Sequence, residues 1–397
     1  MRQRGSRGDL RHQLADGLRT NRPAARSSIG AAWTSALGIG DGSRQSQMGI
    51  AFEMDITSRH AHHAGGRRGR RTLDGPIGRR WTSHDDYPQI VQVIDIPLTM
   101  RHNVVDVWGA DGEGWLANLP SLVQELADAW GLQIHGPAGP LSFHYVVEAT
   151  RKDGSPAVLK IGPTGPGHLA IEAPALDAYA GHGAVRLLAY DPQRGALLLE
   201  QATPGTSAAA LVPGDDAAAT AAIIGVTRRL HHPPASHCPL PDLATQGKAF
   251  ADHLRAGRGA DVLPRHWVQQ AAGLFGELCA SSPDKVVLHG DLHHDNVLQA
   301  NREPWLAIDP HGVVGDPGYE TGALLYNPWP ERREAELLAL VPARIEQLAA
   351  GLTIPVERVV AWGFVKAVLS SVWTCQSGTM PDTRALDVAE LLWPRLP

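Results

Sequence analysis

An Asp-Gly pair between two β-rich runs constrains the fold of this chain more than any other feature of its sequence. In the stretch LSFHYVVEATRKDGSPAVLKIGP, at 141–163, the turn Lys152-Asp153-Gly154-Ser155 separates two runs of alternating apolar residues. Asp-Gly suits a tight hairpin turn, because glycine adopts positive φ without strain. The sequence therefore predicts an antiparallel β-hairpin here.

The elements around this hairpin indicate an α+β protein. An amphipathic helix at 112–132 precedes it, and a helix at 171–183 and two more strands, AVRLLAYD and GALLLEQ, follow it. After residue 203 the pattern favours helices, which we expect at 215–230, 243–256, 264–281, 331–350, 355–376 and 383–393. We thus expect a small lobe at 94–203, with an antiparallel sheet and a helix, and a larger, mainly helical lobe at 204–397.

The first 90 residues differ in composition from the rest of the chain. They contain 15 arginines, no lysine and eight acidic residues, a net charge of +7, and the whole chain carries −5, so the remaining 307 residues carry −12. Because residues 1–90 are rich in Arg, Gly, Ser and His and lack periodicity, we expect them to be mostly disordered. The acidic remainder favours cationic partners and disfavours nucleic acid, unless the arginine-rich segment binds it.

Cysteine content and hydropathy indicate the compartment. The three cysteines, Cys238, Cys279 and Cys375, are widely spaced, which argues against a disulfide framework. A membrane-spanning helix needs 18 or more apolar residues, and no apolar run approaches that length. We therefore expect a soluble, cytoplasmic protein that does not bind a membrane. We separately expect the protein to be a monomer.

The stretch VVLHGDLHHDNVLQANREPWLAIDPHG, at 286–312, concentrates the side chains that suggest chemistry. Asp291 follows a predicted short strand at 285–288, and Asp309 follows another at 305–308. Asn296 lies between them, directly before a predicted return strand that starts at Val297. Phosphoryl transfer uses one carboxylate to orient a hydroxyl, and an amide and a second carboxylate to hold Mg²⁺ against the phosphates. The spacing therefore favours a phosphotransferase.

The histidines of the same stretch leave two other interpretations open. A zinc site would use His289, His293 and His294, but HGDLHHDN matches neither the His-Glu-x-x-His nor the Cys-x-x-Cys pattern. In the second interpretation the histidines only fix the shape of the loop by hydrogen bonding.

The small lobe supplies the other half of a phosphotransferase site. Lys160 ends the second strand of the hairpin and is one of only five lysines in the chain, so we expect it to bind phosphates. Glu172, in the following helix, is placed to hold Lys160, unless it only stabilises the first helical turn. The loop 139–144, which includes Ser142 and Phe143, is expected to cover the phosphates, although it lacks Gly-x-Gly-x-x-Gly.

Together these motifs resemble a known family. The motifs occur in the order found in protein-kinase-like aminoglycoside phosphotransferases, namely Lys160, Glu172, His289-Gly290-Asp291, Asn296, Ile308-Asp309-Pro310 and Gly315-Asp316-Pro317. The phrases LSFHYV, AVLKIGP, GAVRLLAYD, ALLLEQATPGTS and LHGDLHHDNVL are similar to those of the aminoglycoside and hydroxyurea resistance kinases, whose best-known members are streptomycin 6-phosphotransferases. The resemblance covers residues 94–396.

The resemblance implies a role for each motif. Asp291 would be the catalytic base, and Asn296 and Asp309 the Mg²⁺ ligands. Lys160, positioned by Glu172, would contact the phosphates of ATP or GTP. The implied fold is the two-lobed protein-kinase-like fold.

Further residues take their expected roles from the same resemblance. The backbone from Glu200 to Ala202 would bind the adenine, and Asp316 and His289 would support the catalytic loop. The sequence departs from the family pattern at Glu320, where aspartate is common, and at His311, where a smaller apolar residue is frequent. Both residues lie close to the expected metal loop, and neither departure removes a catalytic group.

The resemblance also implies a cationic aminoglycoside as the substrate, most specifically streptomycin, which an acidic protein would attract. The candidate substrate contacts are Asp295, Glu320, Trp373 and Gln376. Two alternatives stay open. In the first alternative, the chain phosphorylates hydroxyurea or another small hydroxyl metabolite. In the second, it is a non-catalytic nucleotide-binding protein with a basic nucleic-acid-binding arm.

Overall fold

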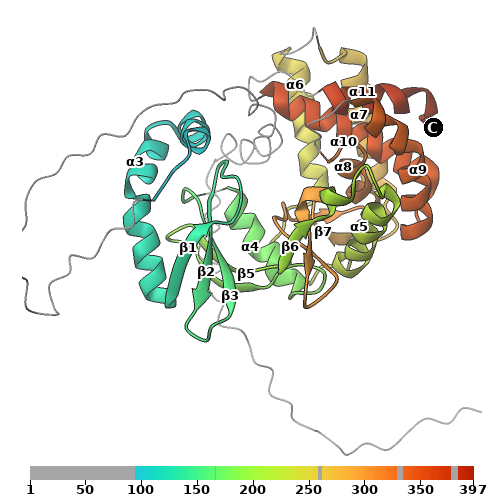
Figure 1. Cartoon of the computed structure of the whole chain (residues 1–397). Coiled ribbons are helices and arrows are strands. Elements are labelled where there is room, and N and C mark those ends of the chain that lie inside the picture. Colours follow the sequence, from blue (N-terminus) through green and yellow to red (C-terminus); the bar gives the residue numbers. More distant parts are fainter. Residues whose placement is uncertain (1–93, 166, 258–261, 329–333, 377–382) are drawn as a thin grey trace, which may run out of the picture. The chain divides into compact units, whose positions relative to one another are not determined.

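The computed structural model describes residues 94–165, 167–257, 262–328, 334–376 and 383–397 (Figure 1). The segment 1–90, for which the sequence predicts disorder, lies outside the described residues. The described part is an α+β protein whose named strands pair antiparallel, and this confirms the predicted fold class.

The predicted hairpin lies in the middle of a five-stranded sheet. β2 (Tyr145–Arg151) and β3 (Pro156–Ile161) pair antiparallel, and Gly154 in their turn has a φ of +81°. The strand order is β1-β2-β3-β5-β4, to which β1 (Leu132–Pro137), β4 (Leu187–Asp191) and β5 (Ala196–Glu200) contribute. The hairpin and the two later strands are confirmed, whereas β1 is an additional strand.

Two helices accompany this sheet (Figure 1). α3 (Leu98–Trp130) begins earlier than the predicted helix because Met100 and Val104 are also buried in the core that it shares with the sheet, and it is kinked at Gly109. α4 (His168–Tyr179) ends before the predicted residue 183, because its C-cap residue, Ala180, has a left-handed φ of 49°.

The remaining strands are short and carry the loops of the candidate site. β6 (Pro204–Ser207), β8 (Val297–Ala300) and β9 (Trp305–Ala307) form a three-stranded sheet, and β7 (Val286–Leu288) pairs with β10 (Val313–Gly315). The sequence predicts β7, β8 and β9 but neither β6 nor β10. A parallel backbone bridge joins Ala184, in the turn before β4, to Ala307 in β9. The division into lobes at residue 203 stays a prediction.

Helices dominate the described chain after β6, close to the predicted positions. They are α5 (Asp216–Leu230), α6 (Lys248–Ala256), α7 (Arg265–Ala280), α8 (Thr321–Leu325), α9 (Glu334–Leu352), α10 (Val356–Gln376) and α11 (Thr383–Leu392). Short 3-10 turns are η1 (Ala208–Leu211), η2 (Leu243–Gly247), η3 (His294–Asn296), η4 (Pro317–Glu320) and η5 (Trp393–Arg395). α5 begins after Asp215, whose carboxylate accepts a hydrogen bond from the N–H of Ala218 at 3.1 Å, as an N-cap does.

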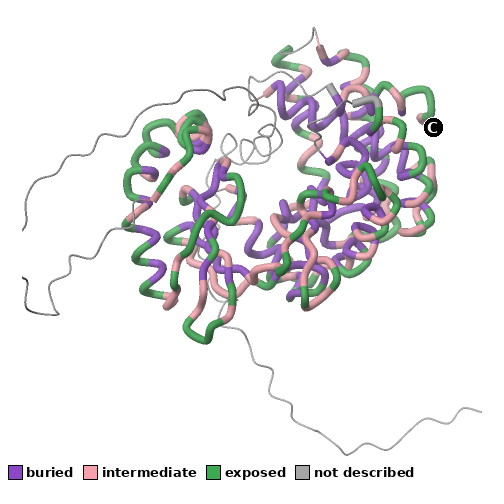
Figure 2. The backbone as a smooth tube through the Cα atoms, in the orientation of Figure 1, coloured by how far each residue is buried: buried purple, intermediate pink, exposed green. Residues whose placement is uncertain are grey.

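α10 is the core helix of this helical part. Its residues are buried almost along its whole length, whereas α3 exposes one face (Figure 2). Among the described helices, α10 is the one whose length and composition would suit a membrane span, but 94% of the relevant window is buried inside the protein. A core helix of a soluble protein has the same properties, so this feature is weak support for a membrane.

Candidate active site

The loop after β7 carries the predicted catalytic aspartate. Gly290 has a φ of +87°, a conformation that favours glycine, and a Cβ at this position would lie 3.2 Å from the Cβ of His311. The chain therefore turns directly after β7 and places Asp291, only 5% exposed, at the start of the loop.

Glu320, at the end of η4, holds the backbone of this turn. Its Oε2 accepts a hydrogen bond from the N–H of His289 at 2.6 Å, and its Oε1 accepts one from the N–H of Gly290 at 2.9 Å. Burial alone would raise the pKa of Glu320, but the close contact with His231, at 3.7 Å, and the hydrogen bond from the loop lower it. The predicted substrate contact by Glu320 does not fit this position, because both oxygens bind the loop and the residue is 4% exposed.

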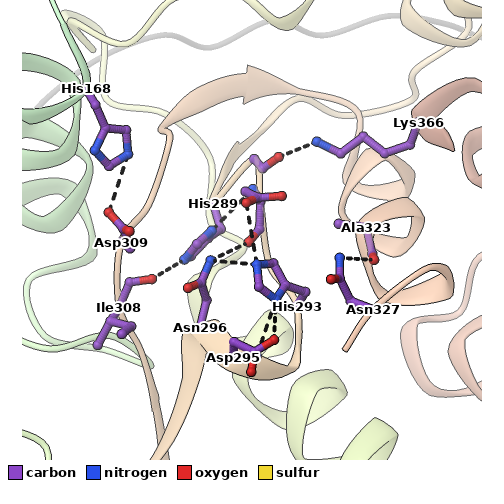
Figure 3. A network of polar contacts seen from close by, with 12 residues as sticks. His168, His289, His293, Asp295, Asn296, Ile308, Asp309, Ala323, Asn327 and Lys366 are labelled. Carbon is purple, nitrogen blue, oxygen red and sulfur yellow. Dashed lines mark hydrogen bonds and ion pairs between the residues drawn. The ribbon is translucent and has the colours of Figure 1, made fainter. Parts of the chain in front are cut away.

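His289 links the two halves of the site, as Figure 3 shows. Its Nδ1 accepts a hydrogen bond from the N–H of Asp291 at 3.3 Å, and its Nε2 donates to the carbonyl of Ile308 at 2.8 Å. Burial lowers the pKa of His289, which agrees with a neutral ring that carries its proton on Nε2. Both ring nitrogens are engaged within the protein, so the geometry fits the predicted support role and disfavours the zinc alternative.

His293 pairs with the catalytic carboxylate. Its Nε2 lies 3.6 Å from Oδ2 of Asp291, and its Nδ1 lies 3.5 Å from Oδ2 of Asp295 (Figure 3). Burial alone would lower the pKa of His293, but the two aspartates raise it to about 10. Burial would likewise raise the pKa of Asp291, but the ion pair with His293 holds it well below its usual range. Asp291 is therefore ionised at neutral pH.

Asn296 and Asp309, the predicted Mg²⁺ ligands, are brought together by the backbone. The N–H of Ile308 donates to the carbonyl of Asn296 at 3.0 Å, and the side-chain amide of Asn296 donates to the carbonyl of Asp291 at 3.0 Å. Asp309 has a φ of 62°, which is uncommon for a residue other than glycine. Carboxylate and amide oxygens are the ligands that Mg²⁺ prefers, so the donor set fits this ion.

Lys160 joins the five-stranded sheet to the loop after β9. Its Nζ donates to Oε2 of Glu172 at 2.7 Å and to Oδ1 of Asp309 at 2.5 Å, although Asp309 lies 149 residues away in the sequence. Lys160 is 5% exposed and Glu172 is fully buried. The structure thus brings the predicted phosphate-binding lysine, its partner and one predicted metal ligand to one place.

A histidine cluster surrounds this ion pair, and its central residue, His168, was not singled out in the sequence analysis. His168 lies 3.4 Å from Oε2 of Glu172 and 3.5 Å from Oδ1 of Asp309, and its ring contacts those of His144 and His311. The ligand atoms of His168, Glu172 and Asp309 lie within 4.8 Å of one another, as metal ligands do. The ammonium group of Lys160 already bonds both carboxylates, however, so these three residues do not suit a cation together.

Ser142 and Phe143 lie against α3. The carbonyl of Ser142 accepts a hydrogen bond from the side chain of Asn103 at 3.2 Å, and Phe143 is 3% exposed and packs edge-on against Trp108. These contacts fix the loop before β2. A role of Ser142 and Phe143 over the phosphates stays a prediction.

The predicted adenine-binding segment at 200–202 is held by an arginine that the sequence analysis missed. Arg302, in the turn between β8 and β9, donates to both carboxylate oxygens of Glu200 at 2.8 Å and to the carbonyls of Gly181 and Ala184. The N–H of Glu200 already donates to the carbonyl of Arg186 at 2.9 Å, so that N–H does not fit the predicted hydrogen bond to adenine. Ala202 stays a candidate.

The other predicted substrate contacts are scattered. The side chain of Asp295 is 51% exposed at the edge of the catalytic loop. Trp373 is 6% exposed inside the helical core, and the side-chain amide of Gln376 donates to the carbonyl of Ala249 at 3.1 Å. The burial of Trp373 fits core packing better than a substrate contact, whereas Asp295 and Gln376 stay predictions.

Asp316 lies where the sequence analysis expects a support residue. Its Oδ1 accepts hydrogen bonds from the N–H of Gly318 at 2.8 Å and from the indole of Trp362 at 2.8 Å, and its carboxylate pairs with Arg358. Asp316 thus caps η4, the turn that ends at Glu320.

Lys366, in α10, contacts the loop of Asp291, because its Nζ donates to the carbonyl of Gly290. The sequence analysis did not single out Lys366, although the scarcity of lysines applies to it as it does to Lys160.

Comparisons with known proteins indicate the family of this chain. Residues 137–378 match the family model of the aminoglycoside/hydroxyurea antibiotic resistance kinases. The streptomycin 6-kinase of Streptomyces glaucescens is 32% identical over 307 residues, which are 76% of this chain and 98% of that protein. The hydroxyurea phosphotransferase of Kitasatospora aureofaciens is 34% identical over 323 residues, which are 79% of this chain and 89% of that protein. A solved aminoglycoside phosphotransferase of Streptomyces rimosus is 21% identical, with a TM-score of 0.45 over 66% of this chain and 98% of that chain.

Proposed function

The chain belongs to the aminoglycoside/hydroxyurea antibiotic resistance kinase family, and we propose that it is an ATP-dependent kinase that phosphorylates a hydroxyl of streptomycin. The enzyme class, a phosphotransferase with a hydroxyl acceptor, follows from the family. Streptomycin as the acceptor is the finer part of the proposal, and the streptomycin 6-kinases among the relatives support it.

The arrangement of Lys160 carries the proposal. A nucleotide phosphotransferase needs a cation on the phosphates beside a carboxylate that holds the metal. Lys160 Nζ lies 2.7 Å from Glu172 and 2.5 Å from Asp309, and Asp309 is joined through Ile308 and His289 to the loop of Asp291. The phosphate-binding and hydroxyl-binding parts of such a site are thus adjacent.

In the proposed reaction, the residues mainly position the reactants. Asp291 is ionised, so it accepts a hydrogen bond from the acceptor hydroxyl and aims the oxygen at the γ-phosphorus. As the new P–O bond forms, the bond from the γ-phosphorus to the β,γ-bridging oxygen breaks, ADP leaves with that oxygen, and Asp291 takes up the hydroxyl proton. Because the transition state is loose, positioning and charge stabilisation supply most of the rate, and a weakly basic carboxylate is sufficient. Lys160 stabilises negative charge on the phosphates. Mg²⁺, held by Asn296 and Asp309, would neutralise further charge.

Hydroxyurea is the second candidate acceptor, because the hydroxyurea phosphotransferase of Kitasatospora aureofaciens is as similar to this chain as the streptomycin kinases are. The two acceptors differ in charge, and the acidic remainder of the chain, with a net charge of −12 after residue 90, favours the cationic aminoglycoside. The assembled Lys160, Asp291, Asn296 and Asp309 argue against the non-catalytic alternative. On this proposal the enzyme acts in the cytoplasm, where ATP is available.

An acceptor panel tests the proposal. The purified protein is incubated with ATP and Mg²⁺ and with streptomycin, hydroxyurea or no acceptor, and both ADP release and the phosphorylated product are measured. We expect phosphorylated streptomycin and an ADP release that depends on it. If ADP release depends on hydroxyurea and not on streptomycin, hydroxyurea is the acceptor instead. If neither acceptor raises ADP release above the background without acceptor, the proposal is contradicted.

A further inference from the structure

Lys366 is a charged residue in the middle of the core helix α10. It is 1% exposed, and it is among the largest fully buried side chains of the described protein. Burial of an ammonium group costs free energy unless polar partners replace its water. A lysine at such a position therefore needs polar partners that stabilise its charge.

The partners of Lys366 belong to the catalytic loop and to η4. Its Nζ donates to the carbonyl of Gly290 at 2.5 Å and to Oη of Tyr319 at 2.8 Å, and Figure 3 shows the side chain extending from α10 to the loop. The ammonium group also lies 4.1 Å from the centre of the Tyr319 ring. It also lies 5.6 Å from the centre of the Trp373 ring. The described partners are thus a carbonyl, a hydroxyl and two rings, and neither hydrogen bond goes to a carboxylate.

The fold leaves room for this side chain. A Cβ on Gly322, in α8, would overlap the Cβ and Cγ of Lys366. The hydroxyl of Tyr319, which accepts from Lys366, itself donates to Oε1 of Gln246 at 2.6 Å. Lys366 is thus held at its base by close packing and at its tip by hydrogen bonds, so its Nζ has a fixed position.

Lys366 and Glu320, which have opposite charges, both form hydrogen bonds to the backbone of the turn at Gly290. Glu320 accepts hydrogen bonds from the N–H groups of His289 and Gly290, and Lys366 donates to the carbonyl of Gly290, the residue directly before Asp291. The peptide bond between Gly290 and Asp291 is therefore held by a charge-assisted hydrogen bond, which is stronger than a neutral one.

We infer that Lys366 is a positioning residue for Asp291, which fixes the catalytic carboxylate from the side of α10. The inference rests on the proposed function, because it assigns Asp291 to the reaction. Without the Lys366 ammonium, the Gly290 carbonyl would lose its buried donor, and the loop would sample orientations in which Asp291 no longer points at the acceptor hydroxyl. Loss of this orientation costs much of the catalytic rate and little of the nucleotide affinity.

The test compares Lys366→Met with Phe364→Leu. Phe364 is fully buried in the same helix and packs against Trp393 on the other side of α10, so its substitution perturbs the core without touching the loop. Two quantities are measured in each full-length variant: amide hydrogen exchange of peptides that cover 286–298 without nucleotide, and kcat and the KM for ATP with the acceptor that the panel identifies.

In Lys366→Met we expect exchange in 286–298 to accelerate about 10-fold, and kcat to fall about 10- to 100-fold with the KM for ATP changed less than about 3-fold. Phe364→Leu should leave both quantities near those of the wild type. Wild-type exchange in the loop, wild-type kcat, or equal effects in both variants would overturn the inference. If the wild type phosphorylates no acceptor, the proposed function fails, and the exchange measurement still decides the role of Lys366.

A second variant guards against loss of folding. Lys366→Gln keeps an N–H donor on a shorter side chain, so its kcat and loop exchange should lie between those of the wild type and of Lys366→Met. Should Lys366→Met not fold, Lys366→Gln takes its place in the comparison with Phe364→Leu. Wild-type values for both quantities in a folded Lys366→Gln variant would then overturn the inference.

Discussion

Glu320 combines a charge, complete burial and two backbone partners, so its protonation state is coupled to the stability of the catalytic loop. Burial alone would raise the pKa of this carboxyl, but its contacts with His231 and the loop lower it below the ordinary 4.5. Because the folded pKa is the lower one, the stabilisation is present above pH 4.5 and is lost as the pH falls through the folded value.

We therefore predict that Glu320→Gln flattens the acid limb of the stability curve. A glutamine keeps one acceptor for the loop but has no proton to gain, so its free energy of unfolding should be lower at pH 7 and fall less between about pH 5 and pH 3 than that of the wild type. Urea unfolding at several pH values measures this. Parallel curves for the two proteins would contradict the role given to Glu320.

The sequence predicts the chemistry of the site and two of its supports, His289 and Asp316, but not the other supports. Asp291, Asn296, Asp309, Lys160 and Glu172 stand out in the sequence because their types and spacing match the needs of phosphoryl transfer. The contacts of Lys366, Glu320 and Arg302 join residues far apart in the chain, and no local pattern marks which buried charge will meet which loop. Their positions follow only from the packed structure.

At the scale of elements, long periodic segments are predicted well, whereas short strands are predicted only in part: β7, β8 and β9 are predicted, and β6 and β10 are not. The hairpin of β2 and β3 and the helices α5, α6, α7, α9, α10 and α11 follow the periodicity of their apolar residues, whereas the five-residue α8 is not predicted. β10 has three residues and β6 has four, too few for a period, and they are strands only because β7 and β8 lie beside them. α3 extends beyond its predicted start because tertiary packing also buries Met100.

The turn between β8 and β9 connects to the five-stranded sheet through one guanidinium. Arg302 bonds both oxygens of Glu200 and the carbonyls of Gly181 and Ala184, and its side chain is 21% exposed. Bidentate pairs of this kind are stronger than single surface contacts, and their loss leaves a partly buried carboxylate without its partner.

We predict that Arg302→Met lowers the free energy of unfolding by about 2–4 kcal/mol and raises the KM for ATP, because the segment 200–202 loses its anchor. Urea denaturation and steady-state kinetics measure the two effects. Arg194→Met is the matched control, since Arg194 pairs with Asp191 at a solvent-exposed turn and its loss should change neither quantity. Equal effects of the two substitutions would contradict the proposed anchor.

At the scale of the whole molecule, the matched family segment and the candidate site both lie after residue 93. We therefore predict that a variant that begins at residue 94 keeps the kcat and KM of the full chain. Steady-state kinetics of both proteins test this. A nucleic-acid mobility shift that the full chain produces and the shortened variant loses would instead give the arginine-rich segment a binding role.

The central claim is that Asp291 directs phosphoryl transfer from ATP to a hydroxyl of streptomycin. The most direct measurement is the rate at which wild type, Asp291→Asn and the control Asp284→Asn convert streptomycin to its phosphate with ATP and Mg²⁺, followed by mass spectrometry. We expect wild-type and Asp284→Asn to form the product at similar rates, because Asp284 is exposed and outside the site. Asp291→Asn should be slower by at least about 100-fold at saturating ATP. Full activity of Asp291→Asn, or no phosphorylated streptomycin from the wild type, would contradict the claim.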